Sequence, residues 1–553
     1  MINCILLSAL LLGGCNKKST SAIIETPPLP LNILSTSIND IQSNALDGSR
    51  FPVASAIKIK LNNSVDRTTV ASAISLSSNA NGDAALSFLY ENNDSTIVVK
   101  PAVSLNYLTR YELQVIPTLK SVKKGSLNNY YSLNFNTQID SSDKFPRVSD
   151  DALLDIVQQK TFKYFWDFAH PVSGLARERN ASGDIVTSGG SGFGIMAIPV
   201  AINRNFITRS EGLTRLKTIV NFLLNKADKF HGAFSHWLNG ATGAVVPFST
   251  KDNGADLVET SYLVAGLLTT REYFNNNSTD EISLRADINK ICDAVEWNWF
   301  RQNNQDVLYW HWSPNYNWEM NHKIIGWNEC LITYIMAASS NNYAIPAAVY
   351  HKGFAANGAI INNKSYYGYS LPLGPSNGGP LFFAHYSFLG INPNGLKDQY
   401  ADYQQQVVNH SKINYQYCLT NPKKYFGYSK NCWGLTASDI PGGYAANEPN
   451  NDIGVITPTA ALSSFPYTPL ESMQALQFFY YTLGNKIFTE YGFMDAFSLK
   501  DNWYSGTTLA IDQGPIIVMI ENYRSQLIWN LLSNCTEVKR GMKNLGFTAP
   551  YIN

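Results

Sequence analysis

The stretch from Lys251 to Thr270 is an almost uninterrupted apolar helix pattern with acidic residues at its N-terminal end. Its apolar residues leave no polar side, which is typical of a helix that is buried on most of its surface. Asp256 and Glu259 are three residues apart and are expected to share one face of this helix, with Asp252 one turn upstream. A carboxylate in such surroundings must be paired, hydrogen-bonded or in contact with water, because stranding its charge is costly.

Two interpretations of this acidic group remain open. The first is a wet cleft in which Asp252, Asp256 and Glu259 bind a polyhydroxylated or cationic ligand. The second is structural ion pairing, for which the candidate cations are Arg177, Arg179 and Lys251.

The chain has 553 residues, more than one ordinary core accommodates, which predicts two domains. A composition of 45% hydrophobic and only 15% charged residues is typical of a globular protein. Lysine plus arginine and aspartate plus glutamate balance at 42 each, so the charge gives no case for binding nucleic acid or an anionic membrane. An uncharged partner is expected.

The first 26 residues have the composition of an address and anchor. A short apolar run ends in Gly13-Gly14-Cys15 and resembles a bacterial lipoprotein signal, with cleavage before Cys15 and lipidation of its thiol. The run has no preceding lysine or arginine, so an ordinary signal peptide or a misassigned start are the alternatives. The expectation is a protein of the bacterial cell envelope, lipid-anchored to the outer membrane and either periplasmic or surface-exposed.

Residues 27–139 are expected to form an all-β sandwich. Short runs that alternate apolar and polar residues, or are rich in β-branched ones, are separated by Asn/Asp/Gly/Ser clusters. These predicted strands are Ala56–Leu61, Ser95–Lys100, Tyr111–Val115 and Tyr131–Phe135. The segment resembles the bacterial Ig-like domains that precede catalytic modules on surface lipoproteins, and a spacer role is favoured over glycan binding.

Residues 140–149 are polar and are interpreted as a linker, after which residues 150–553 are mainly α. Ser149 and Asp150 are candidate N-caps for the first helix. About ten to twelve helices in roughly 400 residues fit an (α/α)6 toroid. The predicted helices cover about 150–168, 191–203, 209–228, 255–275, 281–301, 328–339, 344–356, 398–417, 467–484 and 512–533.

Neither a metal nor a cofactor is expected. The cysteines outside the N-terminal signal match no zinc spacing. Either one pair, such as Cys418 with Cys432, forms a disulfide, or the cysteines are buried free thiols. There is no zinc-hydrolase H-E-x-x-H and no G-x-S-x-G elbow. The Gly-dense run Gly189–Gly194 lacks the lysine of a phosphate loop and is expected to bring backbones close at a helix start.

The loops of the helical domain collect aromatic and histidine residues. Aromatic faces beside carboxylates suit a sugar, whose C–H faces stack while its hydroxyl groups form hydrogen bonds. Most tryptophans are expected in the core, whereas His236, Trp237 and Trp312 are the candidates for the cleft because each tryptophan stands beside a histidine.

Four motifs, in order along the helical domain, carry a resemblance. They are Thr161–Asp167 with His170–Leu175, Ser191–Ala197, Gly254–Thr260 and Ala510–Pro515. These segments are similar to the glucoamylase-like family of bacterial glycoside hydrolases, and within it to the β-1,2-glucanases of glycoside hydrolase family 144. The resemblance implies an (α/α)6 barrel.

The resemblance also implies the catalytic carboxylates. Glu329 in Trp327-Asn328-Glu329 matches the acid, Asp512 matches the second essential carboxylate, and Asp252, Asp256 and Glu259 match further acidic positions of the cleft. A substrate contact at Arg179 is also expected, although Glu178 stands where the family pattern leads us to expect aspartate.

Two carboxyl groups with different pKa values are what glycoside hydrolysis requires. The apolar neighbours of Glu329 predict a raised pKa and a general acid. The helix start at Asp512 predicts an ionised base, with inversion the expected stereochemistry. An ordinary N-cap is the alternative for Asp512.

The expected function is therefore cleavage of β-1,2-glucan to short sophoro-oligosaccharides. Another glucosidase of the same fold and a non-catalytic glycan-binding lipoprotein are the alternatives. The expected partner is an oligo- or polysaccharide, with membrane contact only through the lipid anchor and a monomeric state.

Overall fold

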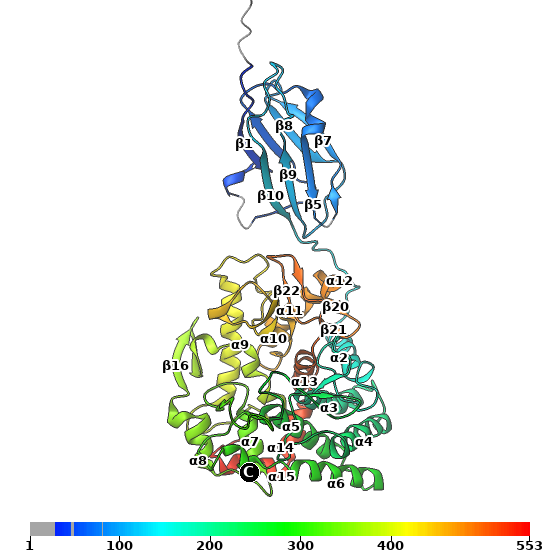
Figure 1. Ribbon diagram of the computed structural model, residues 1–553, viewed down its shortest axis with the longest axis vertical. Coiled ribbons are helices and arrows are strands. Elements are labelled where there is room, and N and C mark those ends of the chain that lie inside the picture. Colours follow the sequence, from blue (N-terminus) through cyan, green and yellow to red (C-terminus); the bar gives the residue numbers. More distant parts are fainter. Residues whose placement is uncertain (1–27, 46–48, 80, 553) are drawn as a thin grey trace, which may run out of the picture. The chain divides into compact units, whose positions relative to one another are not determined.

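The computed structural model describes residues 28–45, 49–79 and 81–552 (Figure 1). These residues divide into two compact units, one that ends at Ile139 and one that begins at Asp140. The expected signal, with the lipidation site at Cys15, lies outside the described residues. No helix in the described part of the chain is long and apolar enough to span a bilayer.

The first unit consists of two antiparallel-rich sheets around one core. The strand orders are β2-β1-β4-β8-β7 and β3-β10-β9-β5-β6. Apolar side chains alternate inward on most of these strands, and they enclose a core that includes Ile59, Val99 and Leu113. The strands are β1 (Ile33–Ile38), β2 (Ile41–Gln42), β3 (Arg50–Phe51), β4 (Ile57–Leu61), β5 (Ile74–Ser78), β6 (Gly82–Asp83), β7 (Leu86–Glu91), β8 (Thr96–Pro101), β9 (Arg110–Val115) and β10 (Tyr131–Thr137). The four strands expected from the sequence are therefore confirmed.

The second unit is built mainly from helices. Its first helix begins after Ser149, whose hydroxyl accepts a hydrogen bond from the Ala152 N–H as an N-cap. The α-helices of five residues or more are α2 (Asp150–Trp166), α3 (Ser188–Asn203), α4 (Arg209–Asn225), α5 (Leu257–Tyr273), α6 (Thr279–Asp293), α7 (Leu331–Ser339), α9 (Tyr403–Thr420), α10 (Pro458–Leu462), α11 (Pro469–Gln477), α13 (Ala510–Ser525), α14 (Leu527–Asn534) and α15 (Thr536–Asn544).

Helix α5 is the buried helix that the sequence predicts. All of its residues from Leu257 to Thr270 are buried, and it packs against α3, α6, α7 and α14. Glycines allow the closest of these approaches. A Cβ on Gly192 of α3 would lie 2.3 Å from the carbonyl oxygen of Tyr262, so the two helices could not pack this closely with any other residue there.

The start of α5 differs from the expectation. The helix begins at Leu257, so Asp256 is its N-cap in the short strand β14 (Ala255–Asp256), and Asp252 lies in the preceding loop. Small two- and three-stranded sheets of this kind connect several helices, and the helical periodicity of the sequence did not predict them. Residues 297–301 form a separate 3-10 helix and not the end of a long helix, because α6 ends at Asp293 with Ala294 as its C-cap.

The cysteines in the described part of the chain are thiols. Cys292, Cys330, Cys418, Cys432 and Cys535 are free, and all but Cys292 are buried. Of the two alternatives, the disulfide between Cys418 and Cys432 is therefore wrong.

Candidate active site

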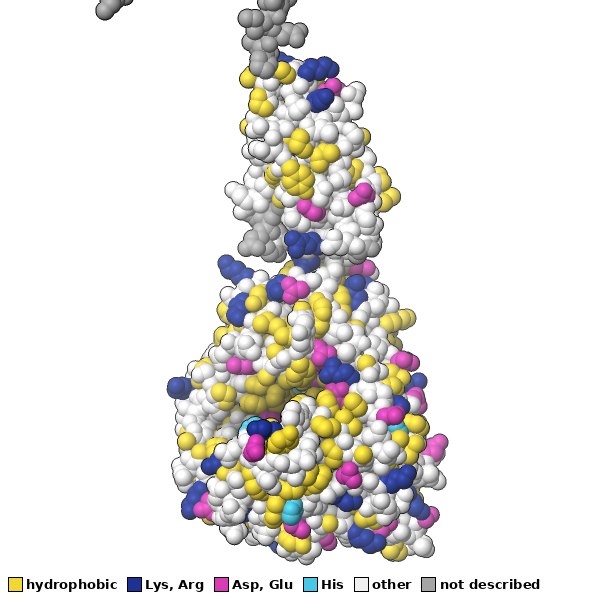
Figure 2. Space-filling view, in the orientation of Figure 1, with side chains coloured by type: hydrophobic (Ala, Val, Ile, Leu, Met, Phe, Trp, Pro, Cys, Tyr) yellow, Lys and Arg dark blue, Asp and Glu magenta, His cyan; other side chains and the backbone are white. Residues whose placement is uncertain are grey.

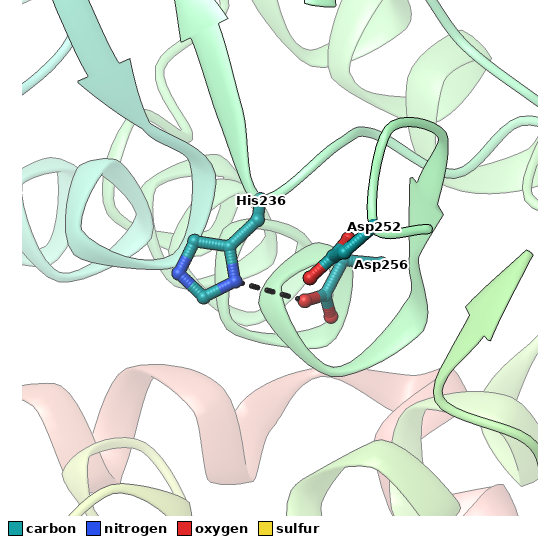
Figure 3. Close-up of side chains that lie close together, drawn as sticks. All are labelled: His236, Asp252 and Asp256. Atoms are coloured by element: carbon teal, nitrogen blue, oxygen red, sulfur yellow. Dashed lines mark hydrogen bonds and ion pairs between the residues drawn. The ribbon is translucent and has the colours of Figure 1, made fainter. Parts of the chain in front are cut away.

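An acidic cluster lies at the N-terminus of α5 (Figure 3). Asp256 is fully buried; its Oδ1 accepts a hydrogen bond from the backbone N–H of Glu259 at 2.9 Å, and its Oδ2 lies 3.0 Å from Nδ1 of His236. Asp252 is 5% exposed and points at the same place from the loop before β14. The cap, and not a shared helix face, brings Asp256 and Glu259 together.

Histidines are the partners of this cluster. Strand β14 pairs with β15 (His311–Trp312) in a register that sets Asp256 opposite His311. His311 Nε2 lies 3.4 Å from Asp252 Oδ2 and 3.7 Å from Asp256 Oδ2. Because His311 is far from these acids in sequence, only the strand pairing reveals it.

Structural pairing with the predicted cations is wrong. Arg177 donates to the backbone carbonyl groups of Gly183 and Phe168, and Lys251 pairs with Glu319 at 2.9 Å. The third candidate, Arg179, pairs with Glu178 and Asp439. None of the three charges compensates the cluster.

Glu259 is held by backbone of the glycine-rich segment. Its Oε2 accepts a hydrogen bond from the Gly189 N–H at 2.8 Å and from the Thr187 hydroxyl at 3.3 Å. A Cβ on Gly189 would lie 2.4 Å from that oxygen. The expected close approach at a helix start is confirmed here, since α3 begins at Ser188.

The cluster has a compensated charge. Burial lowers the pKa of His236, but the carboxylates of Glu259 and Asp256 outweigh it and raise the value to about 9. Burial raises the pKa of Asp252 to about 7, and the neighbouring Asp256 adds to this. Although burial opposes it, the pKa of Asp256 is lowered by the His236 hydrogen bond and the His311 charge. At neutral pH the cluster therefore holds an imidazolium beside an ionised Asp256.

The same group has the donor set of a cation site. His236, Asp252 and Asp256 each offer one ligand atom, and these atoms lie within 4.8 Å of one another. A His/Asp/Asp set suits divalent metals such as zinc or manganese. The His236 imidazolium supplies the same compensation without a metal.

Glu329 lies in the turn before α7 and is half-buried. Its backbone carbonyl accepts hydrogen bonds from the hydroxyl groups of Tyr262 and Ser387. Burial raises its pKa to about 7, and the negative charges of Glu259 and Asp256 act in the same direction. The raised pKa expected from its apolar neighbours agrees with the structure, and the acidic cluster of α5 is a second cause.

Asp512 lies in the first turn of α13 and is 2% exposed. Its carboxyl group shares a side-chain hydrogen bond with Asp495, which stands between β21 (Gly492–Phe493) and β22 (Phe497–Ser498). Burial raises the pKa of Asp512 well above its usual range, and the Asp495 and Asp439 carboxylates raise it further. The prediction that the helix start favours an ionised Asp512 is wrong, because burial and two neighbouring acids outweigh the helix start and raise its pKa.

One tyrosine joins the two acidic groups. Tyr386 packs with its ring 5.9 Å from that of Tyr262 and 5.3 Å from that of Phe193. Burial raises its pKa, and the charges of Asp512, Glu329 and Glu259 raise it as well, so its hydroxyl lies within electrostatic range of both predicted catalytic carboxylates.

Figure 2 shows one face of this unit hollowed near its middle, with hydrophobic side chains on the walls.

The predicted aromatic residues separate into two places. Trp237 and the half-exposed Phe248 flank His236, with ring centroids 4.8 Å apart from each other, next to the acids. Trp312 belongs to another cluster, in which its ring lies 5.5 Å from Trp299. Neighbouring residues of a strand point to opposite faces, so Trp312 points away from the acids that His311 contacts.

Sequence reasoning missed several residues of the site. Asp495 stands inside the run Phe493-Met494-Asp495-Ala496-Phe497. A carboxyl group among apolar neighbours is expected to be buried and to have a hydrogen-bonding partner in the fold, and this is the signal that could have found it. Asp439 and Tyr386 carry no local signal of this kind. His311 stands between Trp310 and Trp312, and the sequence pattern favours the tryptophan over the histidine as the functional residue.

Comparisons with known proteins follow the division into units. A family model described as "Putative glucoamylase" matches residues 321–536, and a model described as "Bacterial Ig-like domain" matches residues 30–137. The chain is 46% identical over 440 residues to the exo β-1,2-glucooligosaccharide sophorohydrolase (non-reducing end) of Parabacteroides distasonis. That match covers 75% of this chain and 61% of the relative, so the chain spans about three-fifths of the relative's length.

Solved structures give the same picture. An endo-β-1,2-glucanase from Chitinophaga pinensis, in complex with sophorotriose and glucose, is 54% identical with a TM-score of 0.72, over 73% of this chain and 100% of that one. A β-1,2-glucanase from Parabacteroides distasonis is 39% identical with a TM-score of 0.71, over 90% of this chain and 73% of that one.

Proposed function

We propose that this chain, which belongs to the glucoamylase-like family of bacterial glycoside hydrolases, cleaves β-1,2-glucan to short sophoro-oligosaccharides. The observation that carries the proposal is Glu329, a half-buried carboxyl group with a pKa of about 7. Glu329 and the second acidic carboxyl group, Asp512, both lie within electrostatic range of the Tyr386 hydroxyl. Relatives that are named as acting on β-1,2-glucan or its oligosaccharides support this substrate.

We assign the role of general acid to Glu329. A carboxyl group with a pKa of about 7 is half protonated at neutral pH and has a proton to donate to the leaving glycosidic oxygen. Asp512 supplies the base that takes a proton from the attacking water. The two side chains belong to separate acidic groups, which favours a gap wide enough for that water and therefore inversion at the anomeric carbon.

The remaining predicted residues are assigned to the sugar. Asp252, Asp256, Glu259 and His236 offer hydrogen-bonding groups, and Trp237 offers an apolar face beside them. Arg179 positions the acids around Asp512 through Asp439. Trp312 would contact a glucan only beyond the acidic cluster, because it packs with Trp299.

The experiment is digestion of β-1,2-glucan by the purified protein, with products separated by thin-layer chromatography. Sophoro-oligosaccharides are expected, with starch oligosaccharides left intact. Glu329→Gln and Asp512→Asn should abolish product, while Glu490→Gln, a change of the same kind at an exposed position, should not. Activity on starch alone would indicate the other glucosidase, and equal behaviour of all variants would indicate a binding protein. The anomer released first, followed by NMR, tests inversion.

The architecture and location are part of the proposal. The succession of helices from α2 to α15 supports an (α/α)6 toroid. The apolar run that ends at Cys15 supports a lipid anchor in the outer membrane. Labelled fatty acid should be incorporated into the expressed protein and not into Cys15→Ser, and light scattering of the unlipidated protein should give the mass of a monomer.

A further inference from the structure

Asp495 and Asp512 form a carboxyl pair inside the second unit. The two side chains are 1% and 2% exposed, and they share a side-chain hydrogen bond. They come from separate segments, since Asp512 is in the first turn of α13 and Asp495 lies between two short strands. The contact therefore depends on the tertiary fold and not on sequence proximity.

The contact fixes a proton. An ionised carboxylate has only acceptor atoms, so two carboxyl groups can share a hydrogen bond only if one of them is protonated. Neither Asp495 Oδ1 nor Asp512 Oδ2 meets a donor group elsewhere in the described part of the chain. The other oxygen of Asp495 is occupied, because it accepts the backbone N–H of Asp439 at 2.7 Å.

The surroundings do not neutralise a second negative charge. The nearby cation is Arg179, and its guanidinium is already shared between Glu178, at 2.9 Å, and Asp439, at 3.2 Å. Asp439 also accepts a hydrogen bond from the Thr507 hydroxyl. The titratable groups that face the pair are Asp439, Glu178, Arg179, Tyr164, Tyr386 and Tyr444.

We propose that Asp495 is a positioning residue that shares one proton with Asp512 through their hydrogen bond, so that the two aspartates act as one base of the hydrolysis. The inference rests on the proposed function. As the water oxygen bonds to the anomeric carbon, the water proton moves to Asp512, and the glycosidic C–O bond breaks as Glu329 protonates the leaving oxygen. The pair then holds two protons, and solvent returns one of them to Glu329.

Infrared difference spectra of the full chain test the shared proton. In a Glu329→Gln/Asp252→Asn background, which removes the two other carboxyl groups with a pKa of about 7, Asp495→Asn should remove a protonated carboxyl band at neutral pH. The amide keeps the acceptor for Asp439 N–H and offers its own N–H to Asp512. Asp512→Asn should remove the same band, because Asp495 is then ionised beside an amide donor, and it serves if the first variant does not fold.

Asp501→Asn is the matched control, because Asp501 is ion-paired with Lys500 and should lose only an ionised carboxylate band. Loss of only ionised bands in both Asp495→Asn and Asp512→Asn would overturn the proposal. These spectra do not depend on turnover, so a chain that fails to cleave β-1,2-glucan leaves their result intact.

A pH profile tests the consequence for catalysis. An O–H donor to a carboxylate makes a shorter and stronger hydrogen bond than an amide N–H. The acid limb of kcat/KM should therefore move to higher pH in Asp495→Asn, by roughly one unit. A merely structural Asp495 would leave the limb in place, because the amide keeps the contact with Asp439, and an unmoved limb in a folded variant contradicts the proposal.

Discussion

Raising the pH through the pKa of Glu329 should switch hydrolysis off. The acid is active when protonated, so kcat/KM falls on the alkaline side of a pKa of about 7. With that value, about 90% of Glu329 is protonated at pH 6, about half at pH 7 and about 9% at pH 8. The rate on sophoro-oligosaccharides should therefore drop roughly fivefold between pH 7 and pH 8.

Two variants test whether the alkaline limb of the kcat/KM profile arises from Glu329. Glu329→Gln should lose about 10²- to 10⁴-fold in kcat/KM, the usual size of a general acid, and should lose the alkaline limb with it. Asp256→Asn keeps an N-cap for α5 but removes a negative charge that raises the pKa of Glu329, so the limb should move to lower pH.

The assay is kcat/KM of each purified variant across neutral pH at constant ionic strength, with folding checked by circular dichroism at both ends. Glu490→Gln, at an exposed position, is the control and should keep the wild-type limb. An alkaline limb that survives unchanged in Glu329→Gln would refute the assignment, since the titrating group would then be another residue.

Four further outcomes follow from the packing and charges. Arg204→Met removes the 2.7 Å partner of the fully buried Glu521, and unfolding in urea should show a loss of about 3–5 kcal/mol, whereas a loss under about 1 kcal/mol would contradict this account. Gly192→Ala places a Cβ against the Tyr262 carbonyl and should cost at least about 1–3 kcal/mol, while Gly443→Ala, with open space, should stay within about 0.5 kcal/mol; equal shifts would be inconsistent with a tight helix contact. Phe248→Ala should raise KM with little change in kcat if the ring beside His236 only binds sugar, and a lower kcat at constant KM would exclude that role. The hydrogen bond from Arg271 lowers the pKa of Glu537 to about 2, although burial acts in the opposite direction. The ion pair therefore stabilises the fold fully above the ordinary glutamate pKa, and this stabilisation is lost as the pH falls toward 2. Glu537→Gln should reduce this loss of stability at acid pH in thermal melts.

Local patterns predicted the elements of this protein better than its contacts. The run of apolar residues predicted α5, because a helix that is buried on all sides has apolar residues at nearly every position. Ser149 predicted the start of α2, because serine is a common N-cap. The pattern placed the start of α5 too early, since a capping aspartate and a helical one look alike in sequence.

The site depended on pairings that no local pattern contains. His311 reaches the acids only through the register of two short strands, and Asp495 reaches Asp512 only through the fold. For the same reason, spacing does not decide between Arg179, Arg177 and Lys251 as partners of the cluster, and it does not mark His236 and His311 as the residues that fill this role.

The two acidic groups solve one electrostatic problem in different ways, and the difference supports their roles. Beside α5, His236 contributes a positive charge, so Asp256 remains ionised and its field raises the pKa of Glu329. Beside α13, the cation is already shared by Glu178 and Asp439, so Asp495 and Asp512 must keep a proton between them. Two carboxyl groups in different environments have different pKa values, and this difference lets one act as the acid and the other as the base at neutral pH. Exchanging the compensation, by His236→Gln in one variant and Asp439→Asn in another, should therefore move opposite limbs of the pH profile. If both changes moved the same limb, the two groups would not have separate roles.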